Sequence, residues 1–191
     1  KLDAVGDPRC GSQSDPLCVT AHNAGLRTAT LFWPGSEAPN RGIRPDDWLP
    51  YDKKLSGIER VDKVLDWLRR PASTRPDFTT LYLDTIDITG HDFGPDSSQM
   101  NDALRNVDAL LARLFAGIRE SGMDGQINIV VLSDHGMAEV APDHVIVLDE
   151  VVPADAIERP ITGVLTGITP KRGREAAVTQ SLLTSEQAWK C

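Results

Sequence analysis

The sequence contains few cysteines, no long apolar run and no basic stripe, and each shortage excludes a class of protein. Its three cysteines, Cys10, Cys18 and Cys191, form no CxxC pair and no even set, so neither a zinc ribbon nor a disulfide framework is predicted. Their pairing state is left open. No stretch approaches the roughly 20 apolar residues that a transmembrane helix needs, so no membrane span is expected in this chain.

The charge balance is acidic, with 28 Asp and Glu against 20 Lys and Arg and a formal net charge of −8. Because no basic cluster is present to neutralise phosphates, we expect no nucleic-acid polymer as a partner. An anionic small molecule remains compatible with this composition, since a bound cation reverses the sign of the field around it.

Strand-like and helix-like segments alternate along the chain. Runs of β-branched and apolar residues predict strands over residues 28–33, 78–84 and 127–134. Apolar residues at steps of three and four predict helices over residues 16–25, 57–70, 96–122 and 173–183. This order predicts an α/β fold with a mostly parallel sheet flanked by helices. A chain of 191 residues is long enough to form one domain with its own core.

Two of these segments carry the sharpest expectations for packing. The run over residues 127–132 is nearly all apolar, which is typical of a strand that is covered on both faces. The helix over residues 96–122 has one continuous apolar stripe, which we expect to face the core: Met100, Leu104, Val107, Leu111, Leu114 and Ile118.

Acidic and imidazole side chains follow two of the predicted strands. Asp134 and His135 end the run IVVLSDHG, and Asp87 and His91 lie just beyond the strand that ends at residue 84. A right-handed strand–helix–strand crossover brings both strand ends to the same edge of a sheet, which is where α/β folds bind ligands. Carboxylates and imidazoles are ordinary Zn²⁺ ligands. We therefore predict that these four residues are metal ligands, with Asp87 and His91 on one side of a helical turn.

Less specific interpretations of these residues stay open. An Asp-His pair after a strand is commonly a helix cap or a loop pair whose hydrogen bonds are satisfied locally. Asp92 could orient the neighbouring imidazole, as carboxylates often do for metal-bound histidines. Tyr82, five residues before Asp87, is either a core aromatic or part of a site. Ser133 is a poor nucleophile, because no elbow glycine precedes it.

Three stretches together resemble the nucleotide pyrophosphatase/phosphodiesterase family of the alkaline phosphatase superfamily. They are FWPGSE, then LYLDTIDITGHDFGPDS, then INIVVLSDHGM, and the likeness covers most of residues 10–150. The resemblance implies an alkaline-phosphatase-like fold and an exported enzyme, periplasmic or extracellular. It also implies hydrolysis of phosphodiester or pyrophosphate bonds in nucleotides or related diesters.

The resemblance further implies two divalent metal ions, with zinc as the expected metal. Asp87 and His91 would belong to one zinc site, and Asp134 and His135 to the other. Tyr82 would be a wall of the substrate pocket that stacks on a nucleobase. The family's nucleophilic Thr and an Asp ligand, which precede this region, and a His ligand that follows it, have no match here. Asp84 stands where the family frequently has Glu.

These departures lead to two expectations. The first is that residues 1–191 are the central part of a single catalytic domain, with four metal ligands, no nucleophile and little or no turnover alone. The alternative is a non-catalytic or degenerate fragment of the same superfamily that binds a metal or a partner protein.

Overall fold

The structure is a computed structural model of the chain, and it describes residues 15–141, 144–161 and 166–185. The chain divides at Met137 into two compact units, Lys1–Met137 and Ala138–Cys191. The expectation that residues 1–191 are part of one catalytic domain stays a prediction. Of the three cysteines, only Cys18 lies among the described residues, and it is buried with a free thiol.

The first unit is built on a parallel sheet with the strand order β2-β1-β3. The strands are β1 (Thr28–Leu31), β2 (Asp47–Leu49) and β3 (Phe78–Leu81). Every residue of the central strand β1 is buried, as expected for a strand with neighbours on both sides and helices over its faces. The predicted α/β fold with a parallel sheet is confirmed. The sequence did not predict β2, because three residues are too few to show a period.

Four helices accompany this sheet: α1 (Leu17–Asn23), α2 (Gly57–Leu68), α3 (Thr85–Phe93) and α4 (Ser98–Glu120). Local chemistry sets their ends. Ser56 and Glu59 form a capping box at the start of α2, and Ser97 accepts a hydrogen bond from the Met100 amide at the start of α4. Within the described residues, no helix is both long and apolar enough to cross a membrane.

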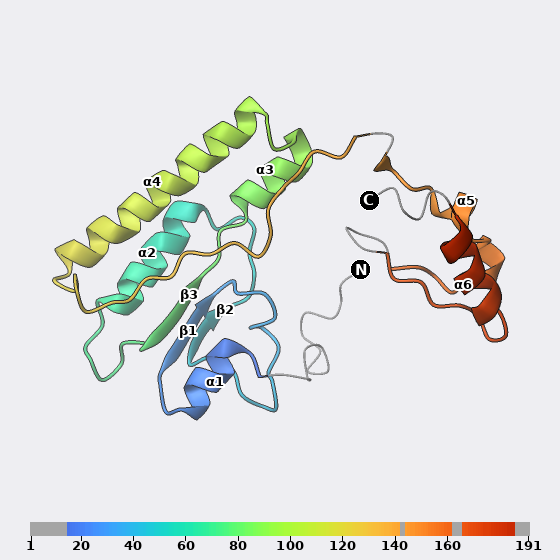
Figure 1. The fold of residues 1–191 in the computed structure, drawn as a ribbon. Helices are drawn as coiled ribbons and strands as arrows, with labels where there is room; N and C mark the ends of the chain where they lie inside the picture. The colour runs from blue at the N-terminus through green and yellow to red at the C-terminus, as the bar shows by residue number, and fades with distance from the viewer. Residues whose placement is uncertain (1–14, 142–143, 162–165, 186–191) are drawn as a thin grey trace. The chain divides into compact units, whose positions relative to one another are not determined.

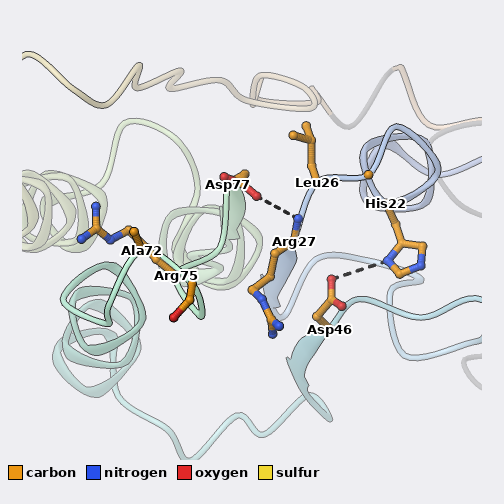
Figure 2. Close-up of a pocket in the computed structure, with 9 residues that line it drawn as sticks. His22, Leu26, Arg27, Asp46, Ala72, Arg75 and Asp77 are labelled. Carbon is orange, nitrogen blue, oxygen red and sulfur yellow. Dashed lines mark hydrogen bonds and ion pairs between the residues drawn. The ribbon is translucent and has the colours of Figure 1, made fainter.

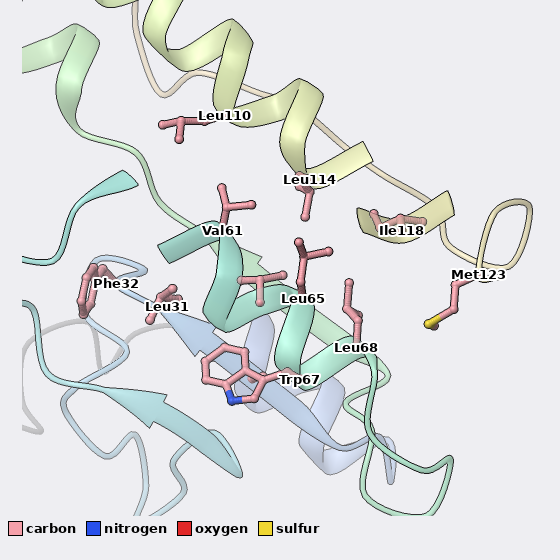
Figure 3. Packing of buried hydrophobic residues seen from close by; sticks show 12 residues of the cluster. Leu31, Phe32, Val61, Leu65, Trp67, Leu68, Leu110, Leu114, Ile118 and Met123 are labelled. Carbon is pink, nitrogen blue, oxygen red and sulfur yellow. The ribbon is translucent and has the colours of Figure 1, made fainter. Parts of the chain in front are cut away.

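Helix α2 lies between the sheet and α4, and the core fills the space on both of its sides (Figures 1 and 3). Trp67 and Leu31 are almost completely buried on the sheet side, and Leu65 lies toward Leu114 of α4. Figure 1 places α1 across the strands from α2. Because α2 contacts both the sheet and α4, it is the helix that fixes the strand ends relative to the outer layer.

The predicted apolar stripe of α4 is only partly right. Leu104 is 47% exposed, whereas Ala103 and Leu110 are buried together with Met100, Leu114 and Ile118. The contact face is shifted because α4 approaches its neighbours through small residues. A Cβ atom on Gly117 would lie only 2.4 Å from the Cδ1 atom of Leu65, which leaves no room for a larger residue there.

The predicted strand over residues 127–134 is wrong. These residues have no strand assignment, and Val130, Val131 and Leu132 are 80%, 65% and 66% exposed. Among the described residues, β3 pairs with β1 alone, and no strand pairs with the 127–134 segment. An apolar β-branched run forms a strand only when a neighbour takes up its hydrogen bonds, so the local sequence was not sufficient. Ile127 alone packs against the core.

The second unit is small and has its own apolar cluster. It contains α5 (Leu148–Val151), the short 3₁₀ helix η2 (Ala154–Ala156) and α6 (Glu175–Thr184), which confirms the helix predicted over residues 173–183. Val152 and Val178 are the most buried members of the cluster, which also contains Val151, Ala156 and Ile157.

An exposed, unpaired apolar run is a site for edge-to-edge association. We expect Val131→Lys to reduce self-association of the chain, because the charge opposes strand pairing between copies. Sedimentation velocity at several concentrations measures this. Leu104→Lys, at an isolated exposed leucine of α4, is the matched control and should have no such effect. Equal behaviour of the two variants would show that the run does not drive association.

Candidate functional site

The candidate site lies at the carboxyl edge of the sheet, where β3 leads into α3. Helix α3 begins after Asp84, so Asp87 falls in its first turn and His91 one turn later. The Nε2 atom of His91 lies 3.5 Å from the Oδ1 atom of Asp87. Helix α3 therefore produces the predicted arrangement, in which Asp87 and His91 lie on one side of a helical turn.

The second predicted pair reaches the same place. The Nε2 atom of His135 lies 3.7 Å from Asp87 Oδ1 and 3.7 Å from Asp134 Oδ2. The structure therefore brings together residues that are more than 40 positions apart in sequence, within the first compact unit. Asp87 is the common member, since its Oδ1 atom faces both imidazoles.

The ring of His135 is oriented by its own loop. Its Nδ1 atom lies 2.9 Å from the carbonyl oxygen of Gly136. Because a carbonyl can only accept, Nδ1 donates in this contact, and Nε2 of the neutral ring keeps a free lone pair toward Asp87. The hydrogen bond to Gly136, followed by the charges of Asp134 and Asp87, raises the pKa of His135. Ser133 Oγ donates to the His135 carbonyl, which fixes the turn.

The donor set can be tested against a divalent ion. Two ligands at about 2.0–2.1 Å from a tetrahedral zinc lie roughly 3.3 Å apart. The 3.5 Å between His91 and Asp87 and the 3.7 Å between His135 and Asp134 suit neighbouring ligands after small side-chain movements. Asp87 Oδ1 is also a buried acceptor without a hydrogen-bond partner. In the part of the chain that the structure describes, however, no group of three or more His, Cys, Asp or Glu side chains forms a complete metal site. Asp87 with His91, and Asp134 with His135, therefore fit a divalent ion as two pairs of ligands.

Tyr82 lies beside these acidic groups. It is partly buried against the core, and burial raises the pKa of its hydroxyl, with further contributions from the charges of Asp84, Asp87 and Asp134. The ring of Tyr82 therefore packs on the core, and its role in a substrate site stays a prediction.

Sequence reasoning missed a network next to the site. Tyr51, just beyond β2, donates a 2.6 Å hydrogen bond to the carboxylate of Asp84. Arg60 of α2 donates to the same carboxylate at 3.0 Å, and its own side chain is only 4% exposed. Burial of the Asp84 carboxyl would raise its pKa, but the Tyr51 hydrogen bond and the Arg60 charge outweigh burial and lower it. If β2 had been predicted from the sequence, Tyr51 would have been expected near the carboxyl end of a strand.

A hollow of about 400 Å³ lies at the opposite, amino-terminal ends of the strands (Figure 2). Its carboxylates are already engaged: Asp77 accepts from the Arg27 amide, and Asp46 from the Thr28 amide. Asp46 also lies 3.5 Å from the Nδ1 atom of His22. These contacts fix the starts of the strands.

Comparison with known proteins identifies the family of the chain. A model of the family described as type I phosphodiesterase / nucleotide pyrophosphatase matches residues 4–188. The chain belongs to this family. A pyrophosphatase/phosphodiesterase of Schizosaccharomyces pombe is 35% identical over 153 residues, which are 79% of this chain and 31% of that protein. A venom phosphodiesterase of Crotalus durissus collilineatus is 41% identical over 128 residues, which are 67% of this chain and 15% of that protein.

The fold of this phosphodiesterase-family chain also has solved counterparts. The murine ectonucleotide pyrophosphatase/phosphodiesterase 5 superposes with a TM-score of 0.84 and 29% identity, over 92% of this chain and 47% of that one. An inactive variant of the murine protein, in complex with AMP, has the same TM-score. The predicted alkaline-phosphatase-like fold is thereby confirmed. The chain spans less than half the length of these relatives.

The lowered pKa of Asp84 predicts how stability depends on pH. The carboxylate stabilises the fold fully above the unfolded-state pKa of about 3.9, and this contribution is lost as pH falls through the lower folded-state pKa. Asp84→Asn leaves Arg60 buried without a counter-charge, so it should lower the free energy of unfolding by about 3 kcal/mol at neutral pH. Urea unfolding at a series of pH values should show this difference shrinking below about pH 4.

Asp102→Asn is the control, because Asp102 forms an exposed pair with Arg105 on α4. Its effect should stay within about 1 kcal/mol at every pH. A difference between Asp84→Asn and the wild type that does not change with pH would contradict the assignment.

Proposed function

We propose that this chain provides metal and nucleotide contacts for zinc-dependent hydrolysis of phosphodiester or pyrophosphate bonds. Family membership supports the reaction class. The observation that carries the metal assignment is Asp87 Oδ1, a buried acceptor without a hydrogen-bond partner that faces the Nε2 atoms of His91 and His135. A cation between this oxygen and the two rings would satisfy it.

In this proposal each side chain has a distinct role. Asp87 and His91 hold one ion, and Asp134 and His135 hold the second. Two divalent ions would supply the positive charge that an in-line displacement at phosphorus needs. His135 is kept in the tautomer that leaves Nε2 free by its hydrogen bond to Gly136. Helix α3 directs Asp87 and His91 to one side through their four-residue spacing.

For the substrate we propose a nucleotide or a related small diester. The AMP complex of the murine relative supports this class, and the aromatic side chains at this edge suit a planar base. Tyr82 would form one wall of the pocket and stack on the base. Tyr51, which is 46% exposed and held by Asp84, offers a second ring nearby.

The nucleophile is not assigned to any residue of this chain. The family resemblance implies a threonine that has no matching position in residues 1–191, so we expect metal and nucleotide binding with little turnover by this chain alone. A non-catalytic, metal-binding role is the second candidate, favoured by the same lack of a nucleophile. Because the relatives include a venom enzyme and an ectonucleotide enzyme, we further propose that the protein acts outside the cytoplasm.

Asp87→Asn should weaken zinc binding by at least about tenfold, because Asp87 is the ligand that both imidazoles face. Isothermal titration calorimetry with ZnCl₂ measures this affinity. Asp102→Asn removes the same charge from an exposed position on α4 and serves as the control. Equal zinc affinity in Asp87→Asn and Asp102→Asn would refute the metal assignment.

Zinc should also strengthen the binding of AMP but leave that of adenosine unchanged, because only AMP carries a phosphate that can reach the ions. Fluorescence or calorimetric titration of the chain, with and without zinc, separates the two ligands. If AMP bound equally well after removal of zinc, the nucleotide and metal sites would be unrelated.

A further inference from the structure

Arg60 is the most completely enclosed charged residue of the described structure, with 3% of its surface exposed. It lies in the first turn of α2, on a chain segment far from Asp87 in sequence. Its guanidinium donates hydrogen bonds in three directions. Nε donates to the Leu55 carbonyl at 2.9 Å, while Nη1 donates to the Tyr82 carbonyl at 3.2 Å and to Asp84 Oδ1 at 3.0 Å. Nη2 adds a longer contact to Asp84 Oδ2 at 3.4 Å.

Two of these partners, Tyr82 and Asp84, lie at the link between β3 and α3. Tyr82 and Asp84 are the residues through which the chain leaves the strand and enters the helix. Asp84 does not cap the helix with its side chain, so its carboxylate is free to bind Arg60 and Tyr51. The direction in which α3 starts is thereby tied to α2, and α2 is anchored in the core.

Two aromatic rings lie against the same guanidinium. The Arg60 Cζ atom lies 5.0 Å from the ring centre of Phe32 and 5.9 Å from that of Tyr51. The two rings meet edge to face, with centres 5.5 Å apart. Phe32 directly follows β1 and has a φ of 60°, a conformation that is costly for a bulky residue and that persists only where its surroundings hold it. The arginine therefore joins the ends of β1 and β3 and the segment after β2.

We propose that Arg60 is a positioning residue for the candidate site: it fixes the start of α3, which carries Asp87 and His91, and the ring of Tyr51. The inference deepens the proposed function and rests on it. Lysine could not replace this residue fully, because its compact ammonium lacks the rigid planar fork of donors with which the guanidinium reaches Leu55, Tyr82 and Asp84 at once.

The middle of α3 is held by packing contacts that do not involve Arg60. A Cβ atom on Gly90 would lie 2.8 Å from the Cε atoms of both Met100 and Met137, so this part of the helix is closely packed. Loss of Arg60 should therefore not release α3 as a whole. We expect its first turn to change direction, with Asp87 and His91 moving relative to His135.

The chain offers a direct readout, since it contains only four histidines. Imidazole signals in ¹H–¹⁵N NMR spectra of the zinc-free 191-residue chain report on His91 and His135 at the site. His22, at the opposite ends of the strands, and His144, in the second unit, serve as internal references. Arg60→Met should shift or broaden the His91 and His135 signals and leave the two references unchanged.

Arg113→Met is the matched control, because Arg113 also binds a carboxylate of α2, Asp62, but does so on the exposed surface. It should leave all four signals in place. Arg60→Lys keeps the positive charge and should remain folded if Arg60→Met does not, with smaller shifts of the same two signals. Unchanged His91 and His135 signals in the folded Arg60 variant would overturn the positioning role.

Addition of zinc separates this inference from the proposed function. In the wild type, zinc should shift His91 and His135, and in Arg60→Lys the zinc concentration needed for half of this shift should rise about tenfold. If zinc left the wild-type signals unchanged, the metal assignment would fail, while the zinc-free spectra would still decide whether Arg60 positions α3. Equal zinc response in the wild type and Arg60→Lys, together with equal zinc-free spectra, would refute the positioning role alone.

Discussion

The ion pair between Arg60 and Asp84 is the interaction on which the carboxyl edge of this sheet depends. A buried ion pair adds little net stability, because the desolvation of two charges offsets their attraction. Its value here is geometric. Arg60 has a fixed planar fork, which joins the segment before α2, at Leu55, to the link between β3 and α3, at Tyr82 and Asp84. Through this ion pair, the position of helix α2 in the core sets the position of the strand ends.

Helix α2 contributes both to the hydrophobic core and to the carboxyl edge of the sheet. Val61, Leu65 and Trp67 of α2 are buried between the sheet and α4, and Arg60 extends from the first turn of that helix. A change in the packing of α2 would therefore be transmitted to α3 through the link at Asp84. Since Asp87 lies in the first turn of α3, the rigidity of the core sets how accurately the candidate ligands are placed.

Much of the fold could be predicted from the sequence, because it follows from local patterns. The helices over residues 57–70 and 96–122 have long apolar periods and clear caps, and the spacing of Asp87 and His91 is a helical spacing. The strand predicted over residues 127–134 failed because strand formation needs hydrogen-bond partners that the segment itself does not supply. Val130 and Val131 are exposed, so a run of β-branched residues is not sufficient by itself to form a strand.

The contacts that hold the candidate site in place could not be predicted from the sequence for a related reason. Arg60 and Asp84 are 24 positions apart, and Tyr51 and Asp84 are 33 apart. Nothing in the local sequence distinguishes Arg60 from the exposed arginines of other helices. Its role follows only from the parallel order of the strands, which brings residues after β1, β2 and β3 to one edge.

We propose that the two acid–imidazole pairs hold two neighbouring metal ions, with Asp87 between the rings of His91 and His135. Anomalous X-ray diffraction at the zinc absorption edge, on crystals of the chain grown with zinc, tests this claim most directly. We expect one peak of anomalous density within about 2.0–2.2 Å of the Asp87 carboxylate and of His91, and a second peak at the same distances from Asp134 and His135. Zinc bound only elsewhere, with Asp87 Oδ1 still uncoordinated, would contradict it.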